Sequence, residues 1–145
     1  MIRTTVIACA VLALSSAASA QQQWTREEME SGVQHQQFNR VVPSGAKRTL
    51  EANLGVLETD CTPVEGYEVR VTTPPEHGVA EVVKVQTFST YAKDNVRSKC
   101  NSQRTPGLNL NYQSNKDFHG ADAFDVEVLL PSGHMRQVHY AITVR

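Results

Sequence analysis

The chain has 145 residues, with 14 basic and 15 acidic side chains and a formal net charge of −1 at pH 7. This length fits one compact domain and excludes a large multidomain enzyme. Hydrophobic residues make up 40% and charged residues 20%, an ordinary globular mix that excludes a disordered chain and a coiled coil. A near-neutral charge gives no support to nucleic-acid binding.

The N-terminus has the pattern of a secretory signal. Arg3 precedes an apolar run over residues 6–14, and small residues then lead to Ala18-Ser19-Ala20. The run is too short to span a bilayer as a helix, and its small-x-small end fits a signal-peptidase site. We therefore expect a signal peptide over residues 1–20 and a periplasmic or secreted mature chain. No later apolar stretch is long enough for a membrane span.

The polar, glutamine-rich segment 21–40 is expected to be a leader to the folded domain. Within it, Thr25 and Glu28 have the spacing of a capping box, which predicts a short helix around residues 26–37. Gly32 weakens this helix. A flexible leader is the alternative.

The domain expected over residues 41–145 lacks helical periodicity and shows short apolar alternations between turn signals. The clearest alternation covers residues 124–130. The Pro-Ser-Gly turn at 131–133 follows, and residues 138–144 continue the same parity, which predicts a closing hairpin. About seven short strands, with turn signals every 8 to 12 residues or so, predict an all-β fold: an Ig-like antiparallel β-sandwich.

Two of the chain's three cysteines remain after removal of the leader. An even count in an oxidising compartment favours a disulfide between Cys61 and Cys100. The alternatives, a metal pair or a reactive thiol, lack local support because neither cysteine belongs to a Cys-x-x-Cys motif.

Several segments resemble the bacterial Ig-like, cadherin-like repeat family. Residues 71–80 (VTTPPEHGVA) resemble its Pro-x-His-Gly turn, and residues 117–126 (DFHGADAFDV), preceded by Leu110-Asn111-Tyr112, resemble its aromatic-x-Gly-x-Asp-x-Phe segment. The resemblance covers about residues 46–144 and implies a non-catalytic spacer or binding module. Ser114 replaces the family's proline, and a single copy argues against a pure spacer.

The motif residues have expected folding roles that do not depend on the family. Gly78 and Gly120 are expected to adopt positive φ where the chain reverses. Phe118 and Phe124 are expected to anchor the core. Asp122 is expected to accept backbone N–H bonds inside its own turn.

The segment 86–107 carries four basic side chains against Asp94 alone. The predicted disulfide would hold this segment near the Cys61 loop and lower the entropy cost of presenting it to a partner. We predict a binding surface for an anionic partner, either an unidentified protein or an acidic polysaccharide. The candidate residues are Phe88, Tyr91, Lys93, Arg97, Lys99 and Arg104. The alternative is a solvated loop that only maintains solubility.

Asp117, Asp122 and Asp125 are weak candidates for calcium ligands, because they cluster near a turn but do not match an EF-hand loop. We therefore expect neither a metal nor a cofactor. Gly-x-Ser-x-Gly, His-Glu-x-x-His and phosphate-cradling glycine motifs are absent from the sequence, so we do not expect an enzyme. The sequence predicts an exported binding or interaction module of the cell envelope. The alternative is a structural envelope or matrix component without a selective ligand.

Overall fold

The computed structural model describes residues 25–145, so the predicted signal peptide lies outside the described residues. This part of the chain holds a short helix, α1 (Arg26–Ser31), a 3-10 helix, η1 (Ser98–Ser102), and seven strands. The strands are β1 (Val33–Val42), β2 (Lys47–Leu54), β3 (Glu68–Thr73), β4 (Gly78–Phe88), β5 (Arg104–Ser114), β6 (Gly120–Leu129) and β7 (Met135–Val144). Over the same residues, no helix has the length and apolar character needed to cross a membrane.

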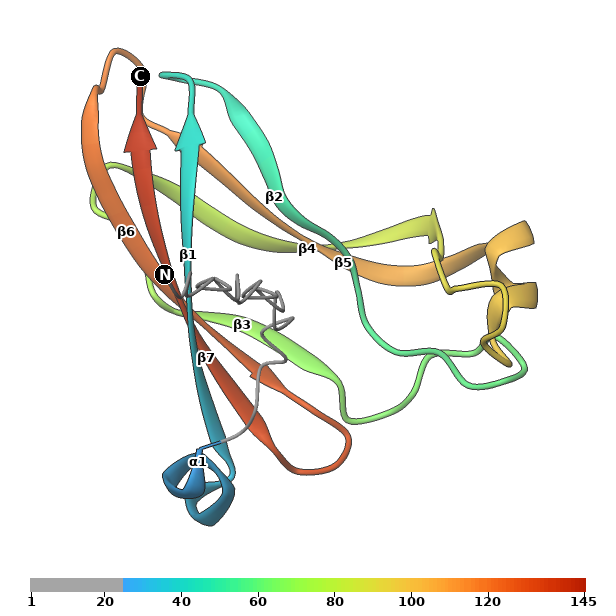
Figure 1. Cartoon of the computed structure of the whole chain (residues 1–145). Helices are drawn as coiled ribbons and strands as arrows, with labels where there is room; N and C mark the ends of the chain where they lie inside the picture. Colours follow the sequence, from blue (N-terminus) through green and yellow to red (C-terminus); the bar gives the residue numbers. More distant parts are fainter. Residues whose placement is uncertain (1–24) are drawn as a thin grey trace, which may run out of the picture.

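The strands form two sheets, in the orders β1-β7-β6-β3 and β2-β5-β4 (Figure 1). Neighbouring strands are antiparallel except β1, which runs parallel to β7. An Ig constant-type sandwich places its first strand with the second, fourth and fifth. Here β1 joins the other sheet at the edge of β7. The prediction of an all-β sandwich of about seven strands is confirmed.

The core lies between the sheets, where the hairpin of β6 and β7 presents its even-numbered side chains. The buried core residues are Val42, Leu110, Tyr112, Phe124, Val126, Val128, Val138, Tyr140, Ile142 and Val144. The Phe124 ring stacks on Tyr112 at 5.8 Å and on Tyr140 at 4.9 Å, measured between ring centroids. Each such side chain stabilises the fold by about 1.5–3 kcal/mol on burial. The parity predicted for residues 124–144 is therefore confirmed.

The helix in the N-terminal segment is shorter than predicted. Its capping box is present: the Thr25 hydroxyl accepts from the Glu28 amide at 3.2 Å, and the Thr25 amide donates to Glu28 Oε2 at 2.8 Å. Gly32 then adopts a left-handed φ of 70° and ends the helix after Ser31. The expectation that the helix continues to residue 37 is wrong.

Strand β1 follows this helix at once, inside the segment expected to be a polar leader. It pairs with β7 along its whole length, from Val33 opposite Met135 to Val42 opposite Val144. The edge of β7 supplies the backbone hydrogen-bond partners, so the strand forms although most of its side chains are polar.

At the end of the sandwich where β6 begins, the carboxylate of Asp122 connects several segments. It accepts the backbone amides of Glu76 and His77 at 3.1 and 3.2 Å and that of Ala123 at 2.9 Å. Two of these donors lie in the connection between β3 and β4, outside the turn in which Asp122 was expected to accept backbone N–H bonds. The two segments that carry the family resemblance therefore meet at this carboxylate.

Glycine is required at position 78 because a side chain would be too close to neighbouring atoms, and not because of its φ. Gly78 is absent from the positive-φ glycines of the described chain, whereas Gly120 has the expected positive φ, at 148°. A Cβ on Gly78 would lie 2.5 Å from the Gln113 carbonyl oxygen and 2.8 Å from a ring carbon of Tyr112. The expectation of a positive φ at Gly78 is therefore wrong, and the reason for glycine is space.

Candidate functional site

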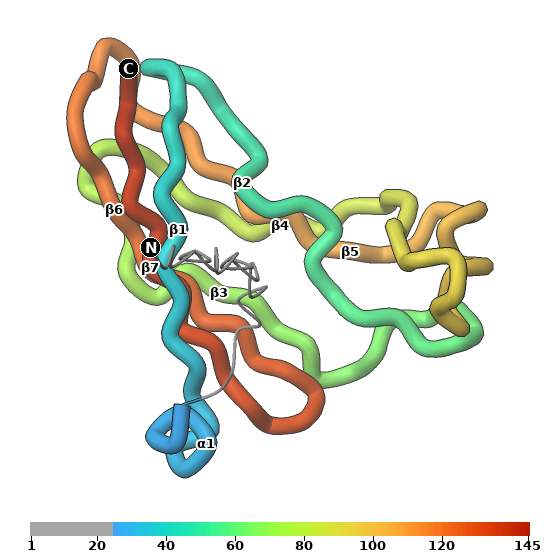
Figure 2. Tube along the Cα trace, in the orientation of Figure 1, coloured from blue at the N-terminus to red at the C-terminus, as the bar shows by residue number. Residues whose placement is uncertain are grey.

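One end of the sandwich carries a projection that we call the disulfide lobe, residues 55–67 and 88–104. Its two halves are far apart in sequence but lie side by side in space (Figure 2). The Cys61–Cys100 disulfide joins them, as predicted, with the two Cα atoms 5.5 Å apart. Leu57 is buried with both cysteines, and Tyr91 packs against them. The lobe thus has a small core of its own.

Two of the six predicted binding residues hold the lobe together. The Tyr91 hydroxyl accepts the Leu57 amide at 3.1 Å, and Nε of Arg97 donates to the Leu57 carbonyl oxygen. Asn101 joins this network by accepting the Tyr91 amide at 3.0 Å and donating to the Tyr91 carbonyl oxygen at 2.8 Å. Tyr91 and Arg97 therefore position the lobe and have little freedom to contact a partner.

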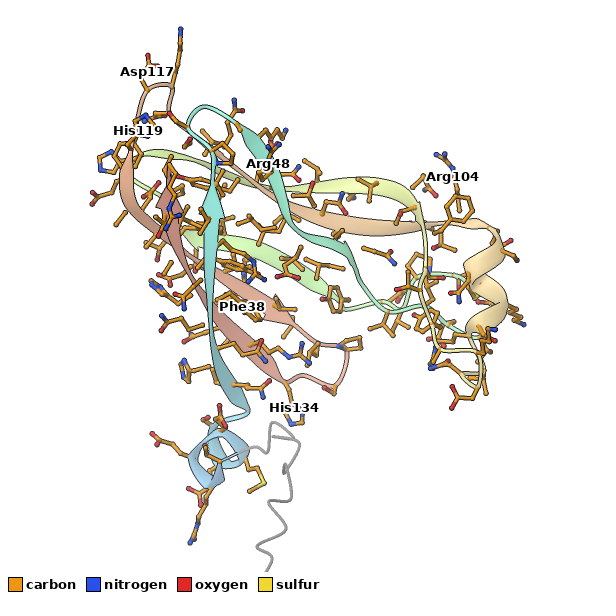
Figure 3. The ribbon with its side chains drawn as sticks, turned by 45° about the horizontal axis from the view of Figure 1, so that its top comes forward. Phe38, Arg48, Arg104, Asp117, His119 and His134 are labelled. Carbon is orange, nitrogen blue, oxygen red and sulfur yellow. A yellow bond between two sulfur atoms is a disulfide. The ribbon has the colours of Figure 1, made fainter. Side chains whose placement is uncertain are left out.

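The other four predicted residues are exposed: Phe88, Lys93, Lys99 and Arg104. The Phe88 side chain remains 50% exposed, which is unusual for a large apolar ring. The Arg104 guanidinium lies over this ring, 5.7 Å from its centroid. In Figure 3 the Arg104 side chain points away from the end of the sheet. These four side chains form the accessible part of the predicted binding surface.

The disulfide also brings an acidic loop to the basic segment. The 55–67 half of the lobe carries three carboxylates, Glu58, Asp60 and Glu65, and no basic side chain. Hydrogen bonds from the hydroxyl and amide of Thr62 lower the pKa of Asp60, and Lys99 contributes a smaller electrostatic effect. These charges offset the excess of basic residues in the other half. The basic segment alone gives no sign of this compensation, because the acidic residues lie in the other half of the lobe, far away in sequence.

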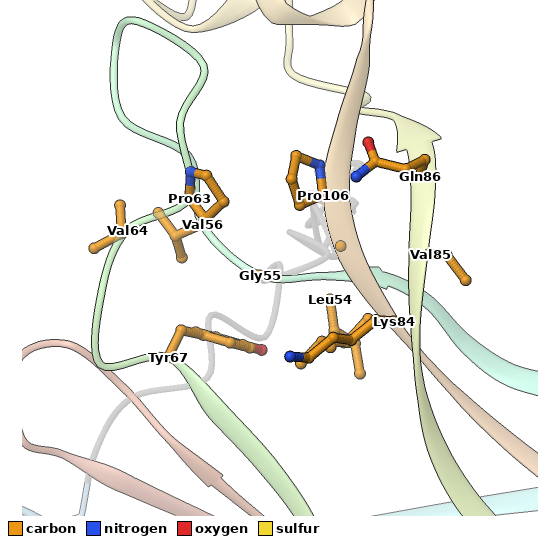
Figure 4. Close-up of a pocket in the computed structure, with 12 residues that line it drawn as sticks. Leu54, Gly55, Val56, Pro63, Val64, Tyr67, Lys84, Val85, Gln86 and Pro106 are labelled. Carbon is orange, nitrogen blue, oxygen red and sulfur yellow. The ribbon is translucent and has the colours of Figure 1, made fainter.

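A groove opens where the lobe meets the sandwich, with a volume of about 540 Å³. Its lining is mostly apolar and comes from the end of β2, the 55–67 loop, and the facing parts of β4 and β5 (Figure 4). Tyr67, just before β3, and Lys84, on β4, point toward one another across it. A groove of this size falls within the range of small-molecule sites in proteins. None of these lining residues is among the six binding residues predicted from the sequence.

The three weak calcium candidates serve separate contacts. The Asp122 carboxylate is buried and bonded as described above, and Oδ1 of Asp125 lies 2.7 Å from Nδ1 of His139. That contact is the main cause of the lowered pKa of Asp125. Asp117 lies on the turn before β6, at the opposite end of the sheet from Arg104 (Figure 3). Within residues 25–145, no group of three His, Cys, Asp or Glu side chains could hold a metal ion.

Comparison with known proteins leaves the family open. No protein-family model and no curated protein matches the chain. Amebosin is a similar solved structure, with 10% identity and a TM-score of 0.38 over 77% of this chain and 98% of amebosin. A 2,6-sialyltransferase of Photobacterium sp. JT-ISH-224 has 13% identity and a TM-score of 0.31, over 77% of this chain and 18% of the enzyme. Scores this low do not identify a fold family or a function.

Proposed function

We propose that the chain is an exported, non-catalytic binding module of the cell envelope, and that its partner is anionic. An N-terminal sequence with the pattern of a signal peptide supports export. So does the Cys61–Cys100 disulfide, because such bonds form and persist in oxidising compartments such as the periplasm or the cell exterior. We further propose that the domain is related to bacterial Ig-like, cadherin-like repeats, on the resemblance of its two motif segments.

The observation that carries the proposal is the exposed pair of Phe88 and Arg104 on a lobe fixed by a disulfide. Folding has already restricted the backbone of this lobe, so binding loses little further conformational entropy. The aromatic face offers apolar contact, and the cations of Arg104, Lys93 and Lys99 offer hydrogen-bond donors to carboxylates.

The carboxylates near the basic segment limit the kind of partner that the lobe can bind. Because the acidic loop offsets the basic segment, the lobe has little net charge to attract a partner from a distance. Recognition must then come from direct contact of individual cations and of the Phe88 ring. An acidic polysaccharide fits this requirement, since it presents separated carboxylates together with the apolar faces of sugar rings.

Retention on immobilised alginate tests this proposal. We expect the purified protein to be retained at low salt and eluted by added salt, because cations contact the carboxylates. The triple variant Lys93→Ala, Lys99→Ala, Arg104→Ala should lose retention, and Phe88→Ala should weaken it. A matched control removes three exposed cations outside the lobe: Arg48→Ala, Lys116→Ala, Arg145→Ala. Equal retention of the two triple variants would contradict the proposal.

A further inference from the structure

The groove exists because the inner face of one sheet extends beyond the other sheet. In Figure 1, β4 and β5 run to the right into the lobe, whereas the β6–β7 hairpin runs toward the bottom. On β5, Leu110 is buried in the core, while Leu108 and Pro106 continue the same face into the groove. On β4, Val82 packs on the core and Lys84 follows at the next inward position.

Lys84 breaks this apolar face with a charge. It pairs directly across the sheet with Leu108, so its ammonium group lies beside an apolar wall. None of the residues described as lining the groove is acidic. Within residues 25–145, the ion pairs also leave Lys84 without a carboxylate. The Lys84 side chain is exposed, so its ammonium group is accessible to a ligand, and a cation beside an apolar wall without an internal partner can pair with a ligand anion.

Tyr67 adds a hydroxyl to the polar end of the groove, whereas Arg136 does not line the groove and acts through its charge on Tyr67. The Tyr67 hydroxyl points toward Lys84 and has no hydrogen-bond partner among the described residues (Figure 4). Burial raises the pKa of Tyr67, and the positive charge of Arg136 acts against that rise. Nε of Arg136 is itself buried without a hydrogen-bond partner in the described chain. The polar end therefore offers hydrogen-bond donors and positive charge, whereas the rest of the wall is apolar.

We propose that this groove binds a small amphipathic carboxylate. Its apolar body lies against Leu54, Val64 and Leu108, and its carboxylate accepts hydrogen bonds from Lys84 and Tyr67. The ligand carboxylate accepts hydrogen bonds from both donors, and its negative charge balances the positive charge of Lys84. A neutral alkyl compound would leave Lys84 unpaired beside the wall, and a cationic one would be repelled. This site uses none of the exposed lobe residues of the proposed polysaccharide surface, so the two proposals fail independently.

Titration with octanoate, followed by protein NMR chemical shifts, tests the proposal, with octanol and octyltrimethylammonium as the neutral and cationic probes. We expect saturable octanoate shifts at groove residues. Octanol should bind about tenfold more weakly, because one charge-assisted hydrogen bond accounts for a factor of that size. Octyltrimethylammonium should not bind measurably. Equal binding of all three probes, or no binding of octanoate at millimolar concentration, overturns the proposal.

Two pairs of variants locate the site. Lys84→Met should weaken octanoate binding about tenfold and leave octanol binding unchanged, while the control Lys116→Met changes neither. Val64→Trp should fill the groove and abolish binding of both compounds, while Val79→Trp, at an exposed position on β4, should not. Unchanged octanoate affinity in Lys84→Met or in Val64→Trp rejects this site. A native-like NMR spectrum of each variant shows that it is folded.

Discussion

The hydroxyl of Tyr112 donates a hydrogen bond to Oδ2 of Asp122 at 2.8 Å, across the interior of the sandwich. Tyr112 lies on β5 and Asp122 on β6, so this bond connects the two sheets. The same carboxylate holds the amides of Glu76 and His77. One buried acceptor thus joins both sheets to the connection between β3 and β4, and the stability of this end should depend on it.

Asp122→Asn should lower the free energy of unfolding by about 2–3 kcal/mol. The substitution keeps the shape of the side chain but turns an NH₂ donor toward groups that are themselves donors. Urea unfolding monitored by circular dichroism measures the loss. Asp117→Asn, at an exposed position near the same end, should change stability by less than about 0.5 kcal/mol. Equal unfolding midpoints for the two variants would exclude a special role for Asp122.

Stability should decrease at alkaline pH because of the buried tyrosines. Burial is the largest cause that raises the pKa values of Tyr112, Tyr140 and Tyr67, and for Tyr112 the bond to Asp122 raises it further. The unfolded chain releases these phenol protons near pH ~10, while the folded chain retains them. Their contribution is therefore complete below about pH 10 and is lost as the pH rises further.

Urea unfolding at several pH values between about 9 and 11 checks this prediction. The free energy of unfolding should fall with pH in the wild type, and Tyr112→Phe should show a shallower fall because one raised pKa is gone. If the free energy of unfolding fell equally with pH in the two proteins, Tyr112 would not contribute to this pH dependence.

Gly78→Ala should destabilise the fold by about 1–3 kcal/mol, since the new methyl group would overlap the Gln113 carbonyl oxygen and the Tyr112 ring. Thermal or urea unfolding measures the loss. Gly133→Ala serves as comparison: its φ is 83°, but a Cβ there meets no atom within 4 Å. It should show only the cost of the backbone conformation, about 1 kcal/mol. A smaller loss at Gly78 than at Gly133 would contradict the steric argument.

Removing the disulfide should cost up to about 4 kcal/mol, the loop-entropy value for a separation of 39 residues. The double variant Cys61→Ala, Cys100→Ala is suited to this test because Cys100 is fully buried and a serine hydroxyl would be left unpaired there. Hydrogen exchange should show the lobe losing protection first, with the β6–β7 hairpin still protected. Uniform loss of protection would show that the lobe is not a separate unit.

Much of the fold could be predicted from the local sequence pattern. Strict alternation around Phe124 and Tyr140, with a turn between, predicted the closing hairpin because strand faces repeat every two residues. The Thr25 and Glu28 capping box was visible at its spacing. The end of that helix was missed, although Gly32 was noted, because its effect as a C-cap depends on the left-handed φ that it adopts.

Less of the candidate site than of the fold could be predicted from the sequence. The sequence named Phe88 and Arg104 as surface residues of a basic segment, and they are exposed. It also named Tyr91 and Arg97, whose partners lie on the Leu57 loop far away in sequence. Lys84 could have been noticed as a charge that follows Ala80 and Val82 on the same face of the predicted strand. That signal has meaning only when the facing sheet is known to end there.

The local sequence pattern was sufficient to predict the β6–β7 hairpin, the faces that this hairpin buries and the pairing of Cys61 with Cys100, because these features follow from the alternation of neighbouring residues and from residue counts. Contacts in the folded chain were needed to show that residues 33–42 form a strand parallel to β7, that an acidic loop offsets the basic segment, and that one sheet extends past the other to leave a groove. These features depend on contacts between segments tens of residues apart. Such contacts are selected by the burial and hydrogen bonding of the whole chain, which no local pattern records.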